Sequence, residues 1–301
     1  MTYLVLRLGV VGTGRVARMH LRAIASLAQV HVSAVAGRTV ETARELAGPV
    51  GADALDDVAS LAGLVDGVIV ASPTACHVEH GTTALRAGRA TLVELPVAES
   101  LAGAEAIATT ADGSLVVGAH TSRWLPAIAR IGEAIRDGRV GDVRRVSISR
   151  SVAPRERSWV DDPLLHHGQH AVDIVRSWLG DVEVLGASAT DGAVEFSLAA
   201  GETLVDASIV HDAPADEQSI RVIGSRGSLT SDGFGVVRGS GGAGGIELDV
   251  SAEAAYARSV LEQDRAFVDA IRFGRVVTPF TETLANVAVV EAVRRRLGHA
   301  A

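Results

Sequence analysis

The chain lacks lysine and has a single cysteine among its 301 residues. One thiol, Cys76, can form neither an internal disulfide nor a cysteine-rich metal site, so we expect a reducing, cytoplasmic setting. All 28 basic residues are arginine, which excludes any mechanism that needs a lysine. No apolar run approaches the ~20 residues of a membrane span. The formal net charge of −8 disfavours nucleic acid as a partner, because an acidic chain repels phosphate backbones.

What is present is a globular composition, with 48% hydrophobic and 21% charged residues. Short β-branched runs alternate with alanine- and leucine-rich amphipathic segments through the first 120 residues. The runs cover residues 4–11, 31–36, 67–71, 90–93 and 115–118. The first run contains Arg7 and follows no basic leader, so it predicts a strand and not a signal peptide. The alternation predicts an α/β fold whose first domain, residues 1–120, is a doubly wound parallel sheet.

The pattern changes after residue 120. We predict helices over residues 125–137 and 164–179 with a strand between them at 143–150. Residues 182–250 alternate like strands, and two helices at 254–273 and 281–297 close the chain. The second domain, residues 121–301, is therefore predicted to be α+β with an open, mostly antiparallel sheet. Its strands supply more apolar surface than the closing helices can cover.

A glycine-rich turn follows the first predicted strand and opens a helix. Gly12 permits the tight turn, Gly14 lets the backbone approach a pyrophosphate, and Ala17 allows close helix–strand packing. The spacing also fits an ordinary βα turn, but the strand–turn–helix context favours a Rossmann dinucleotide site. Its predicted cofactor-binding residues are Gly12, Thr13, Gly14, Arg15 and Val16.

The end of the second predicted strand bears on which nicotinamide cofactor binds. NAD-binding chains place an acid here on the ribose 2′-OH, but this chain has Gly37, Arg38 and Thr39. Gly37 leaves space, Arg38 supplies a cation and Thr39 a hydroxyl, which suits the 2′-phosphate of NADP. Alternatively, Arg38 is a solvated residue at the start of a helix. The prediction is NADP, with NAD possible.

Two further motifs resemble those of the Gfo/Idh/MocA oxidoreductases. They are Ser72-Pro73-Thr74 with His77, and Glu94-Leu95-Pro96 after the next strand. The resemblance covers essentially the whole chain and implies a nucleotide-binding domain followed by an α/β domain with an open sheet. It adds Ser72, Pro73, Thr74, His77, Glu94 and Pro96 to the cofactor-binding residues. The family reads Glu-Lys-Pro, so Leu95 replaces a lysine that assists proton transfer.

Residues 157–173 resemble one branch of that family, the 4-carboxy-2-hydroxymuconate-6-semialdehyde dehydrogenases. That branch also has an apolar residue in place of the lysine, and it uses NADP to oxidise a cyclic hemiacetal. The stretch between Ser149 and Arg157 is shorter here than in the branch and lacks its Arg-Arg…Asn pattern. A carboxylated muconate substrate therefore does not follow from the resemblance.

Three histidines lie within five residues, at His166, His167 and His170. His166 and His170 are four apart on a predicted helix and so share a face. Imidazole titrates near neutral pH, which suits removal of a hydroxyl proton as hydride leaves, so His170 is the predicted base and His166 its helper. Histidines at this spacing can also chelate a metal, but no glutamate stands between them as in zinc enzymes. We expect no metal; a packing or capping role is the remaining alternative.

Polar residues around these histidines are the predicted substrate-binding set. They are Arg123, Arg157, Trp159, His167 and Asp173. Arg123 and Arg157 would bind a substrate carboxylate, although surface arginines of this kind, Arg155 above all, are often only solvated. Asp173 is better suited to orient a histidine or secure its helix than to accept the proton.

These observations predict an NADP-dependent oxidoreductase acting on a cyclic hemiacetal or hydroxy-aldehyde, such as an acid from aromatic catabolism. One alternative is a sugar or inositol dehydrogenase of the same family. Another is a non-catalytic NADP-binding regulator, which has lost its activity because Leu95 replaces the family lysine. The family also implies a homodimer or homotetramer formed through the open sheet of the second domain.

Overall fold

The computed structural model describes residues 5–154 and 162–298. It divides into two compact units, which are described separately. The first comprises Met1–His120 and Val260–Leu284, and the second Thr121–Ser259 and Ala285–Ala301. Residues 260–284 were expected in the second domain but belong to the first, because Phe267 and Val268 pack into its core. None of the described helices is long and apolar enough to cross a membrane.

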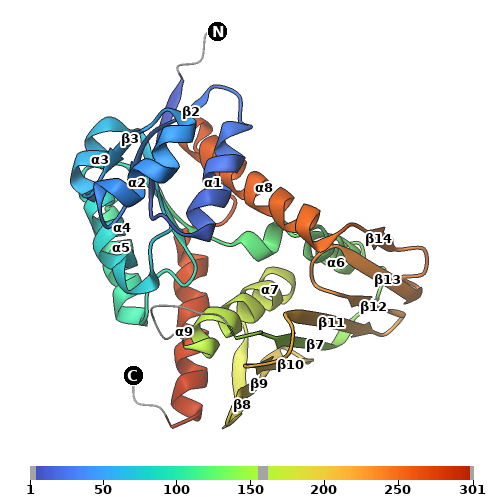
Figure 1. Cartoon of the computed structure of the whole chain (residues 1–301). Helices are drawn as coiled ribbons and strands as arrows, with labels where there is room; N and C mark the ends of the chain where they lie inside the picture. Colours follow the sequence, from blue (N-terminus) through green and yellow to red (C-terminus); the bar gives the residue numbers. More distant parts are fainter. Residues whose placement is uncertain (1–4, 155–161, 299–301) are drawn as a thin grey trace. The chain divides into compact units, whose positions relative to one another are not determined.

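The first unit is built on a six-stranded parallel sheet with the order β3-β2-β1-β4-β5-β6 (Figure 1). The strands are β1 (Leu6–Val11), β2 (Val30–Ala36), β3 (Asp53–Leu55), β4 (Gly67–Val70), β5 (Ala90–Glu94) and β6 (Val116–Ala119). The intervening helices are α1 (Arg15–Ala25), α2 (Val40–Ala47), α3 (Val58–Leu64), α4 (His77–Arg86) and α5 (Leu101–Ala111). This order confirms the predicted doubly wound fold. It brings the loops after β1, β2, β4 and β5 to one edge of the sheet, where such folds bind ligands.

The three-residue strand β3 was not predicted from the sequence. It pairs with the end of β2, with Ala54 opposite Val35. Its residues are polar or only partly buried, so the segment lacks the continuous apolar run that would predict a strand. Tertiary pairing, and not local pattern, makes this segment a strand.

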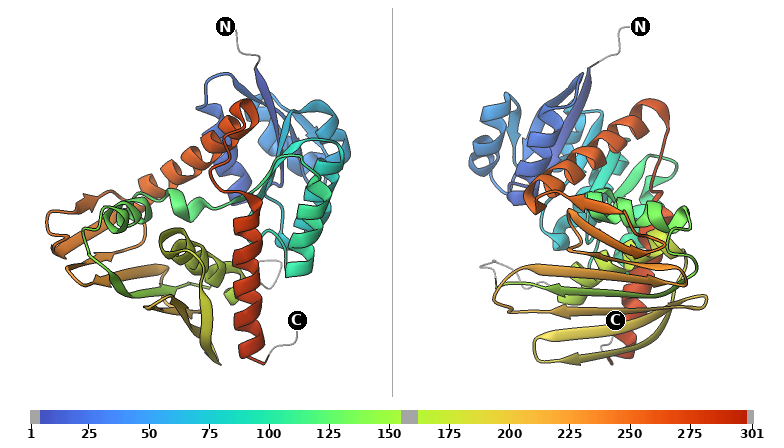
Figure 2. Two further views of the ribbon diagram at one scale, coloured as in Figure 1. Left: turned by 180° about the vertical axis from the view of Figure 1, so that it is seen from behind. Right: turned by 90° about the vertical axis from the view of Figure 1, so that its right-hand side faces the viewer.

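The second unit contains an eight-stranded sheet with the order β14-β13-β12-β11-β7-β10-β9-β8. Its strands are β7 (Val143–Ser151), β8 (Glu183–Thr190), β9 (Ala193–Ala200), β10 (Thr203–Val210), β11 (Glu217–Gly224), β12 (Gly227–Ser231), β13 (Val236–Gly241) and β14 (Glu247–Asp249). Among the described strands of this sheet, only β7 and β10 pair in parallel, which confirms the mostly antiparallel sheet. Helices α6 (Pro126–Arg136) and α7 (Gln169–Leu179) cover one face (Figure 2).

Two long helices close the chain and each contributes to both units. Helix α8 spans Ala252–Phe273 and α9 spans Phe280–Arg296. Ala255 of α8 and Val290 of α9 lie in the core of the second unit. The second half of α8 belongs to the first unit, beside α1 (Figure 1).

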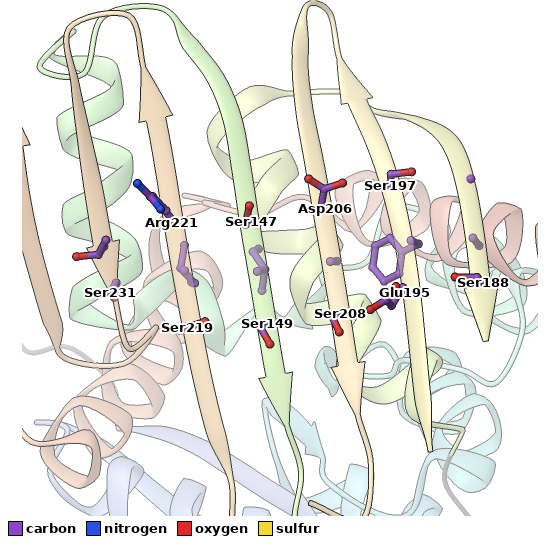
Figure 3. Close-up of a pocket in the computed structure, with 17 residues that line it drawn as sticks. Ser147, Ser149, Ser188, Glu195, Ser197, Asp206, Ser208, Ser219, Arg221 and Ser231 are labelled. Carbon is purple, nitrogen blue, oxygen red and sulfur yellow. The ribbon is translucent and has the colours of Figure 1, made fainter. Parts of the chain in front are cut away.

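The face of the second sheet opposite α7 is polar, so the expected excess of apolar surface is wrong. A hollow of about 760 Å³ lies on this face (Figure 3). Strand alternation sends the large apolar side chains of β7, β9 and β10 toward the helices and leaves short hydroxyl side chains on the other side. The serines that line the hollow are Ser147, Ser149, Ser188, Ser197, Ser208, Ser219 and Ser231. Leu185 and Leu204 are the large apolar side chains exposed on the described strands of this sheet.

Candidate functional site

The glycine turn after β1 has the geometry of a phosphate-binding turn. Gly12 has a φ of +124°, and a Cβ there would lie 2.3 Å from the carbonyl oxygen of Ala71, so only glycine fits. A Cβ on Gly14 would meet no atom within 4 Å, and no side chain caps α1. Ala17, in the first turn of α1, is fully buried. The N-terminus of α1 therefore presents backbone N–H groups to open space, as an anion site requires.

Gly37, at the end of β2, has a different role from the one expected. A Cβ at this position would lie 2.8 Å from Cγ2 of Thr13 and 2.8 Å from Oγ1 of Thr42. The space that we expected to receive the 2′-phosphate of NADP is therefore occupied by the side chains of Thr13 and Thr42. The missing Cβ lets the turns after β1 and β2 pack closely, and the expectation of open space at Gly37 is wrong.

Arg38 and Thr39 are both exposed after β2. The Oγ1 atom of Thr39 accepts a hydrogen bond from the backbone N–H of Thr42 at 3.3 Å and thereby caps α2. It also lies 3.4 Å from Oγ1 of Thr42, which donates to the carbonyl oxygen of Thr39. Within the part of the chain that the structure describes, Arg38 forms no hydrogen bond or ion pair, and its side chain is exposed. Of the other turn residues, Arg15 is exposed and Val16 half-buried.

The loop after β4 is fixed by two histidines. Nε2 of His77 lies 2.6 Å from the carbonyl oxygen of Ser72, and its Nδ1 lies 2.8 Å from that of Pro96. Burial lowers the pKa of His77, so the ring is neutral and donates only one of these hydrogen bonds. Nδ1 of His80 lies 2.9 Å from Oγ of Ser72. His77 was predicted to contact the cofactor; its surroundings favour holding the loops after β4 and β5 together.

Pro73 and Thr74 complete the loop after β4. Pro73 is exposed, and Thr74 is half-buried at the start of a short 3₁₀ turn, Thr74–Cys76. Both therefore remain accessible at the edge of the sheet that carries the glycine turn. At the neighbouring β5, Leu95 is only 6% exposed and Pro96 is buried. An apolar side chain thus fills the position where the resemblance places a lysine.

A buried charge network holds Glu94, the last residue of β5. His20 of α1 is fully buried, with Nδ1 2.8 Å from Asp264 Oδ1 and Nε2 2.9 Å from Glu94 Oε1. Burial opposes charging of the ring, but the two carboxylates outweigh it and raise the pKa of His20 to about 10. His20 is therefore an imidazolium that donates to both acids at neutral pH.

Neither His20 nor Asp264 is apparent as a site residue from the sequence, although part of the pattern is there. His20 follows Ala17 by three residues in a helix, which places both on the face toward the sheet. A buried histidine requires a partner. That partner, Asp264, lies 244 residues away on α8, and no local pattern connects the two.

In the second unit, the histidine segment begins with a π-helical turn and not with the regular α-helix expected. The turn η4 (Leu164–Gly168) precedes α7, and the backbone N–H of Gln169 donates to the carbonyl oxygen of Leu164. Asp162 caps it, with Oδ1 accepting from the N–H of Leu164 at 2.8 Å. Single π-helical turns are rare and occur frequently at functional sites.

The rings of His166 and His170 lie close together, as the four-residue spacing suggested. Their centroids are 6.1 Å apart, and the planes meet edge to face at 80°. Nδ1 of His170 lies 3.2 Å from Oγ of Ser122, on the segment before α6. This contact holds the ring of His170 beside the segment that precedes α6.

Asp173 and Arg123 bind each other. Asp173 is fully buried, and its Oδ1 accepts from Nε of Arg123 and from Nδ2 of Asn286, each at 2.8 Å. Arg176 donates to Asn286 Oδ1 at 2.8 Å and extends the network. Arg123 and Asp173 were both predicted to bind substrate. This geometry favours the alternative for Asp173, in which the acid secures the helix.

His167 lies close to two other histidine rings. Its ring centroid is 4.7 Å from that of His166 and 6.5 Å from that of His211, which follows β10. Burial, together with the positive charge of Arg150, holds the pKa of His167 far below its usual value. The ring is therefore neutral at pH 7. Neither Arg150 nor His211 was identified from the sequence, because the pairing of β7 with β10 brings both near His167 and no local pattern shows this pairing.

Arg157 and Trp159, predicted to bind substrate, lie outside the described residues, as does Arg155. Within the described ranges, no group of three or more histidine, cysteine or acidic side chains is arranged to hold a metal ion.

Comparisons with known proteins give the family and the fold of the chain. The family model described as "Oxidoreductase family, NAD-binding Rossmann fold" of the GFO_IDH_MocA group matches residues 6–119. 4-Carboxy-2-hydroxymuconate-6-semialdehyde dehydrogenase from Sphingobium sp. is 29% identical over 214 residues, which cover 64% of each chain. The chain thus covers less than two thirds of the length of the first curated relatives that it matches.

A relative with broader coverage acts on a nucleotide sugar. dTDP-3,4-didehydro-2,6-dideoxy-alpha-D-glucose 3-reductase from Streptomyces violaceoruber is 30% identical over 248 residues, 75% of this chain and 72% of the relative. Among solved structures, GenD2 from gentamicin A biosynthesis, in complex with NAD, superposes with a TM-score of 0.88. That match covers 99% of this chain and 95% of GenD2 at 22% identity, and it establishes the shared fold.

Proposed function

The chain belongs to the Gfo/Idh/MocA family of oxidoreductases, and we propose that it is an NADP-dependent dehydrogenase of a cyclic hemiacetal or hydroxy-aldehyde. One observation carries the proposal. Buried Leu95 replaces the family lysine, while the second unit supplies a histidine pair, His166 in the π-helical turn η4 and His170 in the first turn of α7. The relative from Sphingobium is a dehydrogenase of a semialdehyde, which supports the same substrate class.

The first unit fits a dinucleotide. The uncapped N-terminus of α1 and the open space at Gly14 suit the pyrophosphate. Arg38 and the Thr39 hydroxyl lie at the end of β2, where an acid would bind an unphosphorylated ribose, and this supports NADP over NAD. When bound, NADP supplies the acceptor of the hydride.

His170 is the proposed general base. With the proton on Nδ1, its ring donates to Ser122 Oγ, 3.2 Å away, and Nε2 would accept the substrate hydroxyl proton. His166, with its centroid 6.1 Å from that of His170, assists by passing the proton onward. Asp173 and Arg123 hold the helix that carries the base.

A hemiacetal is the substrate best suited to this base. Its hydroxyl is more acidic than that of a simple alcohol, and its ring oxygen stabilises the carbon as that carbon is oxidised. An imidazole is then basic enough to take the proton, and the lysine missing at Leu95 is not needed. A sugar alcohol offers neither advantage.

We also propose that the protein is cytoplasmic and forms a homodimer or homotetramer through the open face of the second sheet. Two exposed leucines, Leu185 and Leu204, border a face on which short hydroxyl side chains lie among the charged Glu195, Asp206 and Arg221, and we propose that another copy of the chain pairs with this face. A Ser208→Arg variant places a long cation on this face and should yield a monomer. Light scattering that finds one 31.1 kDa chain in the unsubstituted protein would rule out the assembly.

The activity is tested by following reduced cofactor formation on a panel of cyclic hemiacetals, hydroxy-aldehydes, sugars and inositol, each with NADP and NAD. We expect hemiacetals with NADP to give the highest kcat/KM. Preference for sugars or inositol would replace the proposal with a sugar dehydrogenase. NADP binding by fluorescence titration, with no turnover of any compound, would instead identify a nucleotide-binding regulator.

A further inference from the structure

We infer that His77 is a positioning residue that takes up a proton when the dinucleotide binds, and that it then donates from both ring nitrogens, to the carbonyl oxygens of Ser72 and Pro96. The inference rests on the proposed binding of a dinucleotide at the glycine turn and does not depend on the substrate. In this role His77 acts on the cofactor through the two loops that it joins.

The ring of His77 lies between two hydrogen-bond acceptors. The residue is 1% exposed, and its Nε2 and Nδ1 lie 2.6 Å and 2.8 Å from the carbonyl oxygens of Ser72 and Pro96. A neutral imidazole has one N–H, so it donates to one of these oxygens while its other nitrogen turns a lone pair toward the second. An imidazolium has two N–H groups and donates to both. The contacts of the ring therefore match its charged form, although burial disfavours that form.

The two carbonyl oxygens belong to different loops at the same edge of the sheet. Strands β4 and β5 are adjacent and parallel, with Val70 opposite Val93. Ser72 follows β4 and Pro96 follows β5, so both loops start where the sheet of a doubly wound fold binds its ligand. With one N–H, His77 holds one of these loops at a time. With two, it fixes both loops at once.

The charges near His77 favour the imidazolium once phosphates are bound. A Cβ on Gly12 would lie 2.3 Å from the carbonyl oxygen of Ala71 and 2.9 Å from the backbone nitrogen of Ser72, so the glycine turn adjoins the loop that His77 contacts. Negative charge held at this turn stabilises a positive ring. Glu94 of β5 already acts in that direction, whereas His80, one turn along α4, opposes it.

The test is calorimetric titration of the full chain with NADP at pH 6.5, in MES and in bis-Tris. These buffers differ in ionisation enthalpy, so the difference in heat gives the number of protons taken from the buffer. Because the pKa of His77 in the free chain lies below 6.5, we expect uptake of roughly half a proton or more per NADP bound. Linkage then requires NADP affinity to rise as the pH is lowered, by up to ~10-fold per pH unit.

Variants assign the proton to His77. His77→Asn and His77→Gln each keep one amide N–H, near the place of Nδ1 and of Nε2, and neither side chain can be charged. Both should lose most of the uptake and bind NADP ~5-fold or more weakly at pH 6.5. His80→Asn is the matched control, because it removes the neighbouring imidazole of the same helix and should keep the uptake. The 2′-phosphate of NADP also titrates near about pH 6, but its share is common to all the variants.

Each outcome decides the role of His77. Binding of NADP without proton uptake, or the same uptake in His77→Asn and His77→Gln as in the unsubstituted chain, would overturn it and leave the proposed dehydrogenase in place. The first of these results needs no variant, so it is decisive even where a variant does not fold. If NADP did not bind at all, the proposed cofactor would be wrong as well.

Discussion

His20 in the first unit and His167 in the second are both buried imidazoles with opposite charge states. His20 lies between the carboxylates of Asp264 and Glu94, which raise its pKa to about 10 despite burial. His167 lies near Arg150 and three other histidines, and burial together with these groups lowers its pKa. Burial disfavours the charged ring in both places, so the sign of the neighbouring charges decides the outcome.

The two networks also differ in completeness. Both ring nitrogens of His20 have carboxylate partners within 3 Å, so the network in the first unit is closed. Nδ1 of His167 has no hydrogen-bond partner. A network in which every buried polar atom has a partner stabilises the fold, whereas a buried polar atom without a partner is suited to bind a ligand or a water molecule.

The largest effect is expected from removing one of the two carboxylates that bind His20. Asp264→Asn removes one carboxylate from the buried imidazolium and should lower the free energy of unfolding by ~3–5 kcal/mol. Asp66→Asn is the control, since it breaks an Arg7 pair whose side chains are 51% and 34% exposed. Loss of that exposed pair should lower the free energy of unfolding by ~1 kcal/mol or less. Denaturant unfolding at pH 7 measures both, and equal losses would contradict the comparison.

Alkaline pH should weaken the same network. The folded pKa of His20, about 10, lies above its ordinary value of 6.5. Its stabilisation is therefore complete below about pH 6.5 and is lost as the pH rises toward 10, with a slope of up to ~1.4 kcal/mol per pH unit. His167 has the opposite sign, since its lowered pKa makes its contribution fall as the pH drops below 6.5. Unfolding between pH 7 and 9 should show the alkaline decline, and a His20→Gln variant should flatten it.

Removing the proposed base should affect turnover and not cofactor binding. His170→Ala should lower kcat by ~10²-fold or more, with NADP affinity nearly intact. His166→Ala should cost less, and the two losses should not add if both residues serve one proton transfer. Steady-state kinetics on one hemiacetal provides the measurement. A His170→Ala enzyme with the original rate and pH profile would exclude this residue as the base.

The smallest effect concerns cofactor choice in the first unit. Arg38→Ala should weaken NADP binding by ~10- to 100-fold, through loss of a charge-assisted contact, with little change for NAD. Arg44→Ala removes an exposed arginine from the adjoining helix and should change neither affinity. Fluorescence titration with both cofactors distinguishes the cases. Equal losses for NADP and NAD would show that Arg38 supports the turn and does not bind the phosphate.

Much of the first unit was predictable because its signals are local. Apolar runs, amphipathic helices and the glycine turn lie within a few residues of one another, and they led to the parallel sheet that the structure has. The role of Gly37 was not predictable, since the atoms that crowd it, on Thr13 and Thr42, come from two other segments. The polar open face of the second sheet was also missed, because its serines meet only when the strands are aligned in register.

The sequence by itself determined the order of strands and helices, the turn that suits a dinucleotide, the missing lysine and the spacing of His166 and His170. These are properties of neighbouring residues and of composition. Only the tertiary structure decided the charge around each histidine, because Asp264 reaches His20 across 244 positions and His211 reaches His167 from the end of another strand. Electrostatic interactions depend on distance in space and on burial, and neither is defined until the chain has folded.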